Sequence, residues 1–302
     1  MTAGLIVLRV IALTIVLFVF FALASGVVGL DSSQPSQPAG SAALALIAVC
    51  VLEVIVVTYL ILRSRWSGWR LAAAVFFVFY GVTTFMPQIE SAVFLTRLPE
   101  GTVPRLFLMG ALIAAPFSVL AVLILGKRKA GPDNPEPNSR LAMPASEWGW
   151  KLAVIALAYV FLYFTFGYFI AWRNPAVREY YGGVDPGSFL RQMGTVLRNT
   201  PWLVPLQIVR AMCWVAIALP VIRMLQGRCT ETTLALGFLF AVLMNAQLLL
   251  PNPYMPEPVR MAHLIETASS NFAFGLLIGW LLTRRHAFPA VAIAQRGLKA
   301  RL

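Results

Sequence analysis

Eight long runs of apolar side chains divide this sequence, and each run is long enough to cross a lipid bilayer. A helix needs about 20 apolar residues to span roughly 30 Å of hydrocarbon, and within that layer it satisfies its own backbone hydrogen bonds. The predicted spans are 5–29, 42–62, 71–95, 105–126, 149–172, 202–225, 232–250 and 260–283. The chain is therefore predicted to be all-α, a polytopic transmembrane helix bundle with about eight transmembrane helices.

The composition agrees with a bilayer environment. Of the 302 residues, 59% are hydrophobic and 12% are charged, whereas soluble domains average about 45 to 50% apolar and about 25% charged residues. The net charge of +12 would suggest nucleic acid in a soluble protein, but most Lys and Arg residues lie between the apolar runs, where they determine topology. We expect no nucleic-acid partner. The three cysteines show no CxxC spacing, so no disulfide framework is expected.

The Lys and Arg residues also predict the orientation of the chain. One set of alternate connections, including 61–70, 127–151 and the C-terminal tail, carries 15 of them, and the opposite set carries 7. The positive-inside rule then predicts that both termini are cytoplasmic. The expected location is the cell (inner) membrane. Residues 22–25 have the small side chains of a signal-peptide cleavage site. We nevertheless expect the first run to be retained as an anchor, because eight spans put both termini on one side.

A polar, Pro-rich segment separates two groups of four spans within one integral membrane domain. The predicted parts are a first half (1–126), a cytoplasmic linker (127–148), a second half (149–283) and a basic cytoplasmic tail (284–302). Equal halves suggest an internal repeat, and 88–92 resembles 264–268. The glutamate of this match lies near the end of one span and near the start of the other, so no repeat is indicated.

Polar side chains of separate spans gather at one depth, in the predicted outer half of the bilayer. They come from the third, sixth, seventh and eighth spans, with one further acid near the middle of the second: Gln88, Glu90, Gln207, Arg210, Asn245, Gln247, His263, Glu266 and Glu53. Ionisable groups in hydrocarbon are costly unless they are paired or hydrated, and they usually mark functional sites. The pattern predicts a cavity that opens to the outer face.

Helical geometry brings polar side chains of the eighth span onto one face. At about 100° per residue, His263, Glu266 and Ser270 fall within about 60° of one another, with Thr267 and Asn271 beside them. The site hypothesis combines these residues with Glu90, while Arg210 or Asn271 orients or neutralises the acids. Further along the same span, 275–279 forms a GxxxG pattern that would let another helix approach closely.

A structural interpretation of the same acids stays open. In this interpretation, Glu53 or Glu90 pairs with Arg210 and serves helix packing alone, because buried ion pairs occur without function. For Glu53, a single acid in an otherwise apolar run, packing is the favoured interpretation.

The longest predicted outer connection contains an amphipathic segment. Ser188 supplies a helix cap, and apolar residues then recur at helical spacing over 189–197 with Arg191 and Arg198 outside the apolar stripe. This pattern predicts one interfacial amphipathic helix in the outer leaflet. It is either a lid or lipid guide for the cavity, or a simple connector.

Known catalytic signatures are absent from the sequence. There is no HExxH zinc motif, GxSxG elbow or phosphate-binding Gly loop, and we expect no metal and no cofactor. The leading hypothesis is a small transporter or permease for a cation, proton or cationic substrate. The alternatives are an intramembrane enzyme, a hydrolase or metal-dependent enzyme using His263, Glu266 and Glu90 on a lipid or membrane peptide, and an accessory subunit of a membrane complex. Expected partners are the lipid bilayer and a small-molecule, ion or lipid substrate, and association into an oligomer is compatible with these features.

Overall fold

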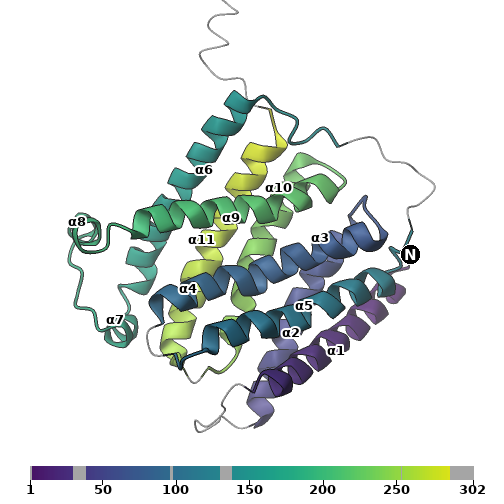
Figure 1. The fold of residues 1–302 in the computed structure, drawn as a ribbon, viewed down its shortest axis with the longest axis horizontal. Coiled ribbons are helices and arrows are strands. Elements are labelled where there is room, and N and C mark those ends of the chain that lie inside the picture. The colour runs from purple at the N-terminus through teal and green to yellow at the C-terminus, as the bar shows by residue number, and fades with distance from the viewer. Residues whose placement is uncertain (1, 30–38, 96–97, 130–137, 253, 286–302) are drawn as a thin grey trace, which may run out of the picture.

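The computed structural model is an all-α bundle in which eight helices are long and apolar enough to cross a membrane (Figure 1). It describes residues 2–29, 39–95, 98–129, 138–252 and 254–285. The eight candidate spans are Ala3–Val28, Gly40–Leu62, Gly68–Phe94, Thr102–Ile124, Ala145–Ala171, Leu203–Met224, Cys229–Leu249 and Glu257–Thr283. All eight predicted spans are thereby confirmed, and the protein is a multi-pass membrane protein. Much of the predicted linker and most of the basic tail, at 130–137 and 286–302, lie outside the described residues.

Some spans are single α-helices and others are assembled from shorter pieces. The uninterrupted helices are α1 (Ala3–Val28), α2 (Ala39–Leu62), α5 (Thr102–Ile124), α9 (Leu203–Met224) and α11 (Glu257–Thr283). The third span joins α3 (Gly68–Tyr80), the π-helical turn η1 (Gly81–Phe85) and α4 (Met86–Phe94). The fifth joins α6 (Ala145–Phe166) and the π-helical turn η2 (Gly167–Ala171). The seventh joins α10 (Cys229–Phe238), the π-helical turn η3 (Leu239–Leu243) and the 3₁₀ turn η4 (Ala246–Leu249).

Two of the three π-helical turns, η1 and η3, have local causes in the sequence. Pro87 has no N–H, so the carbonyl of Thr83 loses its usual helical donor four residues later. Near η3, the Asn245 side chain donates to the Ala241 carbonyl oxygen over 2.8 Å and replaces a backbone donor there. Turns of this kind are common at functional sites, and each of the three lies in a span that reaches the cavity described below.

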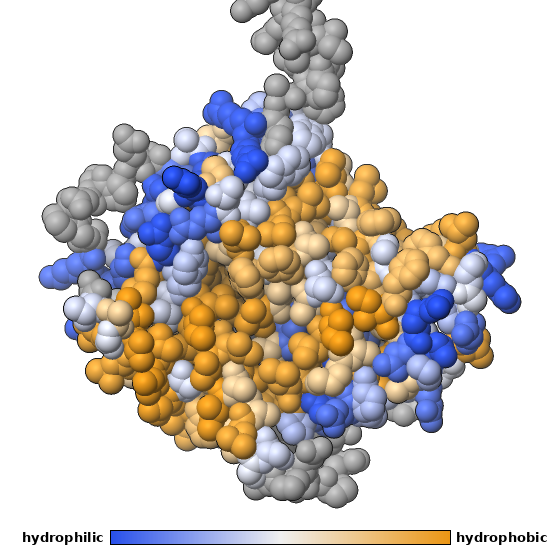
Figure 2. Space-filling model, turned by 180° about the vertical axis from the view of Figure 1, so that it is seen from behind, coloured by the Kyte–Doolittle hydropathy of each residue, from blue (hydrophilic) through white to orange (hydrophobic). Residues whose placement is uncertain are grey.

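The outward surface of the bundle suits contact with lipid. Figure 2 shows a broad apolar band between two polar ends on one face of the molecule. Large apolar side chains remain exposed there and on other faces, including Leu8, Ile15, Leu157 and Phe161. A water-soluble protein rarely exposes so large an apolar area, so the bilayer is the environment that accounts for this surface.

Two short helices lie between the fifth and sixth spans, at the left edge of Figure 1. They are α7 (Pro175–Tyr181) and α8 (Phe189–Asn199). The predicted cap of α8 is confirmed, since the Ser188 hydroxyl accepts a hydrogen bond from the Arg191 N–H at 3.3 Å. Leu190 and Leu197 are exposed on α8, as an amphipathic helix at a membrane surface requires. Its position in the outer leaflet stays a prediction.

The GxxxG pattern of α11 packs directly against α10. A Cβ atom added at Gly275 would lie 2.5 Å from the Leu236 carbonyl oxygen, and one added at Gly279 would lie 2.5 Å from the Thr233 Cα. Only residues without a side chain allow two backbones to approach this closely. The expected close helix approach is confirmed, with α10 as the partner.

The two halves of the chain are tied together at the end of the bundle that is predicted to be cytoplasmic. The turn after α2 and the turn after α9 form an isolated antiparallel bridge between Ser64 and Leu225. The Arg65 N–H donates to the Met224 carbonyl oxygen at 2.8 Å, and the Gln226 N–H donates to the Arg63 carbonyl oxygen at 2.9 Å. We call this pair of turns the inner tie.

Charged side chains reinforce the inner tie. Arg63 donates to both carboxylate oxygens of Glu231, at 2.6 and 2.9 Å, and these hydrogen bonds raise the pKa of the Arg63 guanidinium. Arg140 donates to the Leu225 carbonyl oxygen at 3.2 Å and to the Thr232 hydroxyl at 2.7 Å. A two-pronged Arg–carboxylate contact fixes geometry as well as supplying attraction, so the Arg63–Glu231 pair holds the two halves together at the inner tie.

Candidate functional site

A cavity of about 530 Å³ lies at the opposite end of the bundle from the inner tie. Its wall is built by α4, α6, η2, α7, α8, α9, α11 and the segment that follows η3. The volume falls within the range of roughly 300 to 1,000 Å³ that is typical of small-molecule sites. Seven of the predicted site residues line it: Glu90, Arg210, Asn245, His263, Glu266, Ser270 and Asn271.

One side of the cavity holds an ion pair between Glu90 of α4 and Arg210 of α9. The Arg210 side chain is almost completely buried, at 2% exposure, whereas Glu90 retains 31%. Arg210 also donates to the Gln207 side-chain oxygen at 2.9 Å and lies over the ring of Tyr159, 5.7 Å from its centre. A guanidinium cannot lose its proton in a protein, so this permanent cation depends on Glu90 for compensation.

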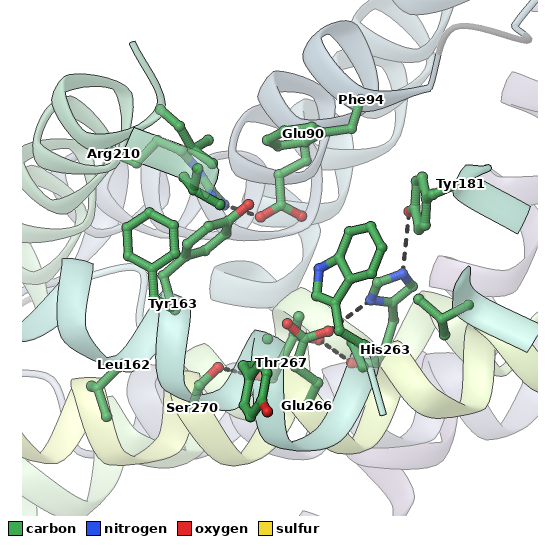
Figure 3. A pocket seen from close by; sticks show the side chains of 18 of the residues that line it. Glu90, Phe94, Leu162, Tyr163, Tyr181, Arg210, His263, Glu266, Thr267 and Ser270 are labelled. Carbon is green, nitrogen blue, oxygen red and sulfur yellow. Dashed lines mark hydrogen bonds and ion pairs between the residues drawn. The ribbon is translucent and has the colours of Figure 1, made fainter. Parts of the chain in front are cut away.

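The other side of the cavity holds the pair His263 and Glu266 of α11. His263 Nδ1 lies 2.8 Å from Glu266 Oε2, and His263 Nε2 lies 3.2 Å from the hydroxyl oxygen of Tyr181 on α7. Figure 3 shows the two pairs facing each other, with Tyr181 beyond the imidazole ring. The three side chains therefore form one row from the short helix α7 to the cavity.

This row fits a neutral imidazole with its proton on Nδ1. An ionised Glu266 only accepts hydrogen bonds, so Nδ1 is the donor. Burial raises the pKa of the Tyr181 phenol, which keeps its proton available for donation to Nε2. The imidazole then makes both of its hydrogen bonds without a positive charge. If it gained a proton on Nε2, this nitrogen would become the donor and the Tyr181 oxygen the acceptor.

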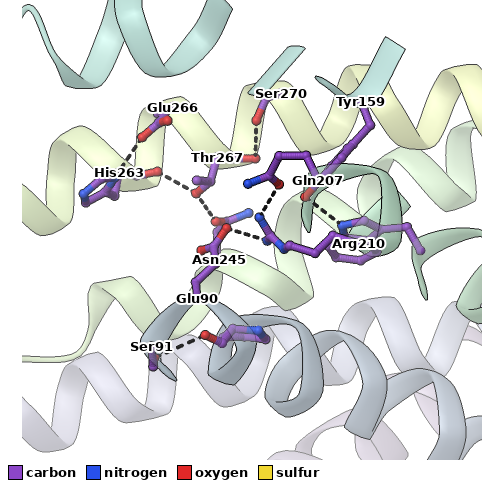
Figure 4. A network of polar contacts seen from close by, with 12 residues as sticks. Glu90, Ser91, Tyr159, Gln207, Arg210, Asn245, His263, Glu266, Thr267 and Ser270 are labelled. Carbon is purple, nitrogen blue, oxygen red and sulfur yellow. Dashed lines mark hydrogen bonds and ion pairs between the residues drawn. The ribbon is translucent and has the colours of Figure 1, made fainter. Parts of the chain in front are cut away.

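Small residues and hydroxyls give the acids room and support. A Cβ atom at Gly167 of η2 would lie 3.4 Å from Glu266 Oε1, so the glycine leaves space beside the carboxylate. Thr267 donates to the Asn245 side-chain oxygen and thereby joins α11 to the segment after η3 (Figure 4). The Ser270 hydroxyl lies 3.3 Å from the Thr267 carbonyl oxygen and bonds within its own helix.

The formal charge of the cavity depends on the protonation of His263. Glu90 and Glu266 supply two negative charges, Arg210 supplies one positive charge, and His263 is uncharged in the state just described. The formal charge is therefore −1 with a neutral imidazole and zero with a protonated one. Much of the remaining wall is aromatic and comes from α4, α6 and the outer connection: Phe94, Tyr159, Tyr163, Phe164, Tyr168, Trp172 and Tyr181.

Four of the polar side chains expected at or near this depth do not line the cavity: Gln88, Gln207, Gln247 and Glu53. Gln88 of α4 is buried elsewhere, and its side-chain oxygen has no hydrogen-bond partner among the described residues. Glu53 of α2 is 0% exposed and lies outside the cavity wall. All four side chains were expected here because sequence position fixes their depth, but depth alone does not fix the direction in which they point.

The geometry limits the chemistry that the cavity suggests. Within the described residues, no group of three His, Cys, Asp or Glu side chains is placed to share a metal ion. The Ser269 hydroxyl bonds to the Ile265 carbonyl oxygen at 2.5 Å, and Ser270 bonds to Thr267. Neither serine is presented to His263, so the arrangement of nucleophile and base that acyl transfer requires is not formed by these residues.

Several residues of the site were not expected from the sequence. The sequence predicted no place in the site for Tyr181, although Asn174 and Pro175, at the start of the same short segment, are typical of a helix start. The Asn174 side chain indeed caps α7 by accepting from the Ala176 N–H at 2.9 Å. The tyrosines of α6 gave no signal, because aromatic residues are equally common where a span faces lipid.

Comparison with protein-family models, curated proteins and solved structures found no match.

Proposed function

We propose that this protein is a transporter or permease whose cavity binds a small organic cation. The observation that supports the proposal is the charge of the cavity: two carboxylates face one permanent cation, Arg210, inside a wall rich in aromatic rings. Aromatic faces attract alkylammonium groups, and the attraction is stronger where water is excluded. A ligand with one positive charge would bring the formal charge of the site to zero.

The two acids have different parts in this proposal. Glu90 is committed to Arg210, whereas the partner of Glu266 is a histidine that can be neutral. The negative charge that remains for a ligand therefore belongs chiefly to Glu266. Protonation of His263 would cancel this charge, so a proton and the cation would compete for the same site.

A matched pair of ligands tests the proposal directly. Benzyltrimethylammonium and neopentylbenzene have nearly the same shape, but only the first carries a charge. We expect saturable binding of benzyltrimethylammonium to the purified protein by calorimetry, and uptake of labelled ligand by proteoliposomes. Equal affinity for the neutral compound, or no binding of either, would contradict an organic-cation site.

Replacing Glu266 with Gln should abolish uptake and weaken binding of benzyltrimethylammonium at least tenfold. Glutamine keeps the size of the side chain and removes its charge, and a tenfold change corresponds to about 1.4 kcal/mol. The measurement is binding by calorimetry and uptake at fixed pH, with membrane insertion checked by the yield of monodisperse protein. Glu257→Gln, at the exposed start of the same helix, is the matched control and should retain both activities. Full uptake by Glu266→Gln would remove this residue from the mechanism.

A further inference from the structure

Glu53 is a carboxylic acid enclosed in the first half of the bundle. It lies in the interior of α2, is 0% exposed, and has the buried side chains of Cys50, Val54 and Val57 around it on the same helix. Neither of its carboxyl oxygens has a hydrogen-bond partner among the described residues. The Gln247 amide is the polar side chain that reaches toward the carboxyl group, but it completes no hydrogen bond of ordinary geometry.

In the part of the chain that the structure describes, no charged side chain compensates Glu53. Of the elements that pack against α2, α1 carries Arg9, α3 carries Arg70 and Tyr80, and α5 carries Arg105. The turns η3 and η4 carry no ionisable side chain. The Arg9 guanidinium bonds to the Leu125 carbonyl oxygen at the far end of α5, and the other two arginines lie in the first turns of their helices. None of them forms an ion pair with Glu53.

An ionised carboxylate in this position would be very unfavourable. Transfer of an isolated charge to an apolar interior costs so much that the group takes up a proton instead. A glutamine would fill the same volume, and it differs from the neutral acid in having no proton to release. The chemical property that Glu53 adds to this core is therefore reversible protonation.

A short irregular segment connects Glu53 with the cavity. Gln247 in η4 faces Glu53, and Asn245, two residues earlier, lines the cavity and accepts a hydrogen bond from Thr267. η3 and η4 also pack against α2. A ligand that displaces Asn245 would therefore move the segment that covers Glu53.

We propose that Glu53 is a proton-binding site separate from the cavity, occupied when the cavity is empty and emptied when a cation enters. The inference rests on the proposed function for its second half, because the cation is the ligand assigned to the cavity. Entry of a positive charge favours the ionised form of a nearby acid, and the moving segment would bring the Gln247 amide to the carboxylate as a donor. Cation binding would then release a proton, which is the exchange that an antiporter performs.

Infrared spectroscopy of the full-length protein tests whether Glu53 holds an exchangeable proton. A protonated carboxyl gives a carbonyl stretch that is separate from the carboxylate bands and shifts in D₂O. We expect this band at neutral pH in the unmodified protein and in Glu257→Gln, and its loss in Glu53→Gln. A spectrum that is unchanged by Glu53→Gln, or a Glu53 band that does not shift after prolonged exchange in D₂O, would overturn the proposal.

The difference spectrum with and without benzyltrimethylammonium tests the link to the cavity. Saturating ligand should remove the protonated-carboxyl band in the unmodified protein. Glu53→Gln should show no such spectral change, although it should still bind the cation within about threefold of normal affinity. Persistence of the band at saturation would overturn the link. If calorimetry shows no binding to the unmodified protein, the proposed function of the cavity fails, while the exchange experiment still decides whether Glu53 is a proton site.

Discussion

Replacing Glu90 with Gln should destabilise the protein by about 3 to 5 kcal/mol, because it leaves the buried Arg210 guanidinium without a counter-charge. Arg210→Met should destabilise it less. The remaining Glu90 is 31% exposed in the cavity and can be hydrated there, whereas Arg210 is only 2% exposed and keeps its charge. The thermal unfolding midpoint in detergent measures the loss of stability. Reversible unfolding by titration with a denaturing surfactant gives the free energies of unfolding.

The double variant Glu90→Gln/Arg210→Met provides the control for this prediction. It removes both charges and should regain most of the stability lost in Glu90→Gln, since a neutral pair requires no compensation. A double variant as unstable as the sum of the two single variants would show that the side chains act independently. Equal losses of stability in Glu90→Gln and Arg210→Met would contradict the argument that the more deeply buried charge depends more on its partner.

A methyl group added to the α10–α11 contact should also have a large effect. Gly275→Ala places a Cβ atom 2.5 Å from the Leu236 carbonyl oxygen, and the backbone of α10 must move to admit it. Overpacking of this kind costs about 1 to 3 kcal/mol, and Gly279→Ala, which meets the Thr233 Cα, should behave in the same way. The unfolding midpoint again measures the loss.

Gly149 of α6 supplies a control of identical chemistry. A Cβ atom there meets nothing within 4 Å, so Gly149→Ala should leave stability unchanged or raise it by up to about 1 kcal/mol through better helix propensity. The same Gly→Ala substitution is thus expected to lower stability at Gly275 and to preserve or raise it at Gly149. Destabilisation of equal size at both would show that the close contact is not the cause.

The spans were predictable because length and apolar character determine which segments can cross a bilayer. The GxxxG contact was predictable for a similar reason, since closely packed helices need small residues on one face. The partner helix was not, because the pattern on α11 contains no information about α10. The π-helical turns were also missed, although Pro87 and Asn245 are the residues that accompany two of them.

Depth in the membrane was the part of the site that sequence reasoning could supply. Glu90, Arg210, His263 and Glu266 were expected at one level, and they line one cavity. The sequence allowed two interpretations of the acids, a functional site and a structural ion pair. Both describe part of the structure, since Glu90 pairs with Arg210 at the cavity wall. Glu53 shares neither partner nor cavity, because its side chain lies toward Gln247 of η4.

The inner tie determines where the two halves can separate. Opening the cavity end further leaves the bridge between Ser64 and Leu225, the Arg63–Glu231 pair and the Arg140 bonds intact. Opening the other end breaks all of them together. In the proposed transporter, release of the cation on the far side would require these contacts to break together, so the inner tie would act as the far-side gate.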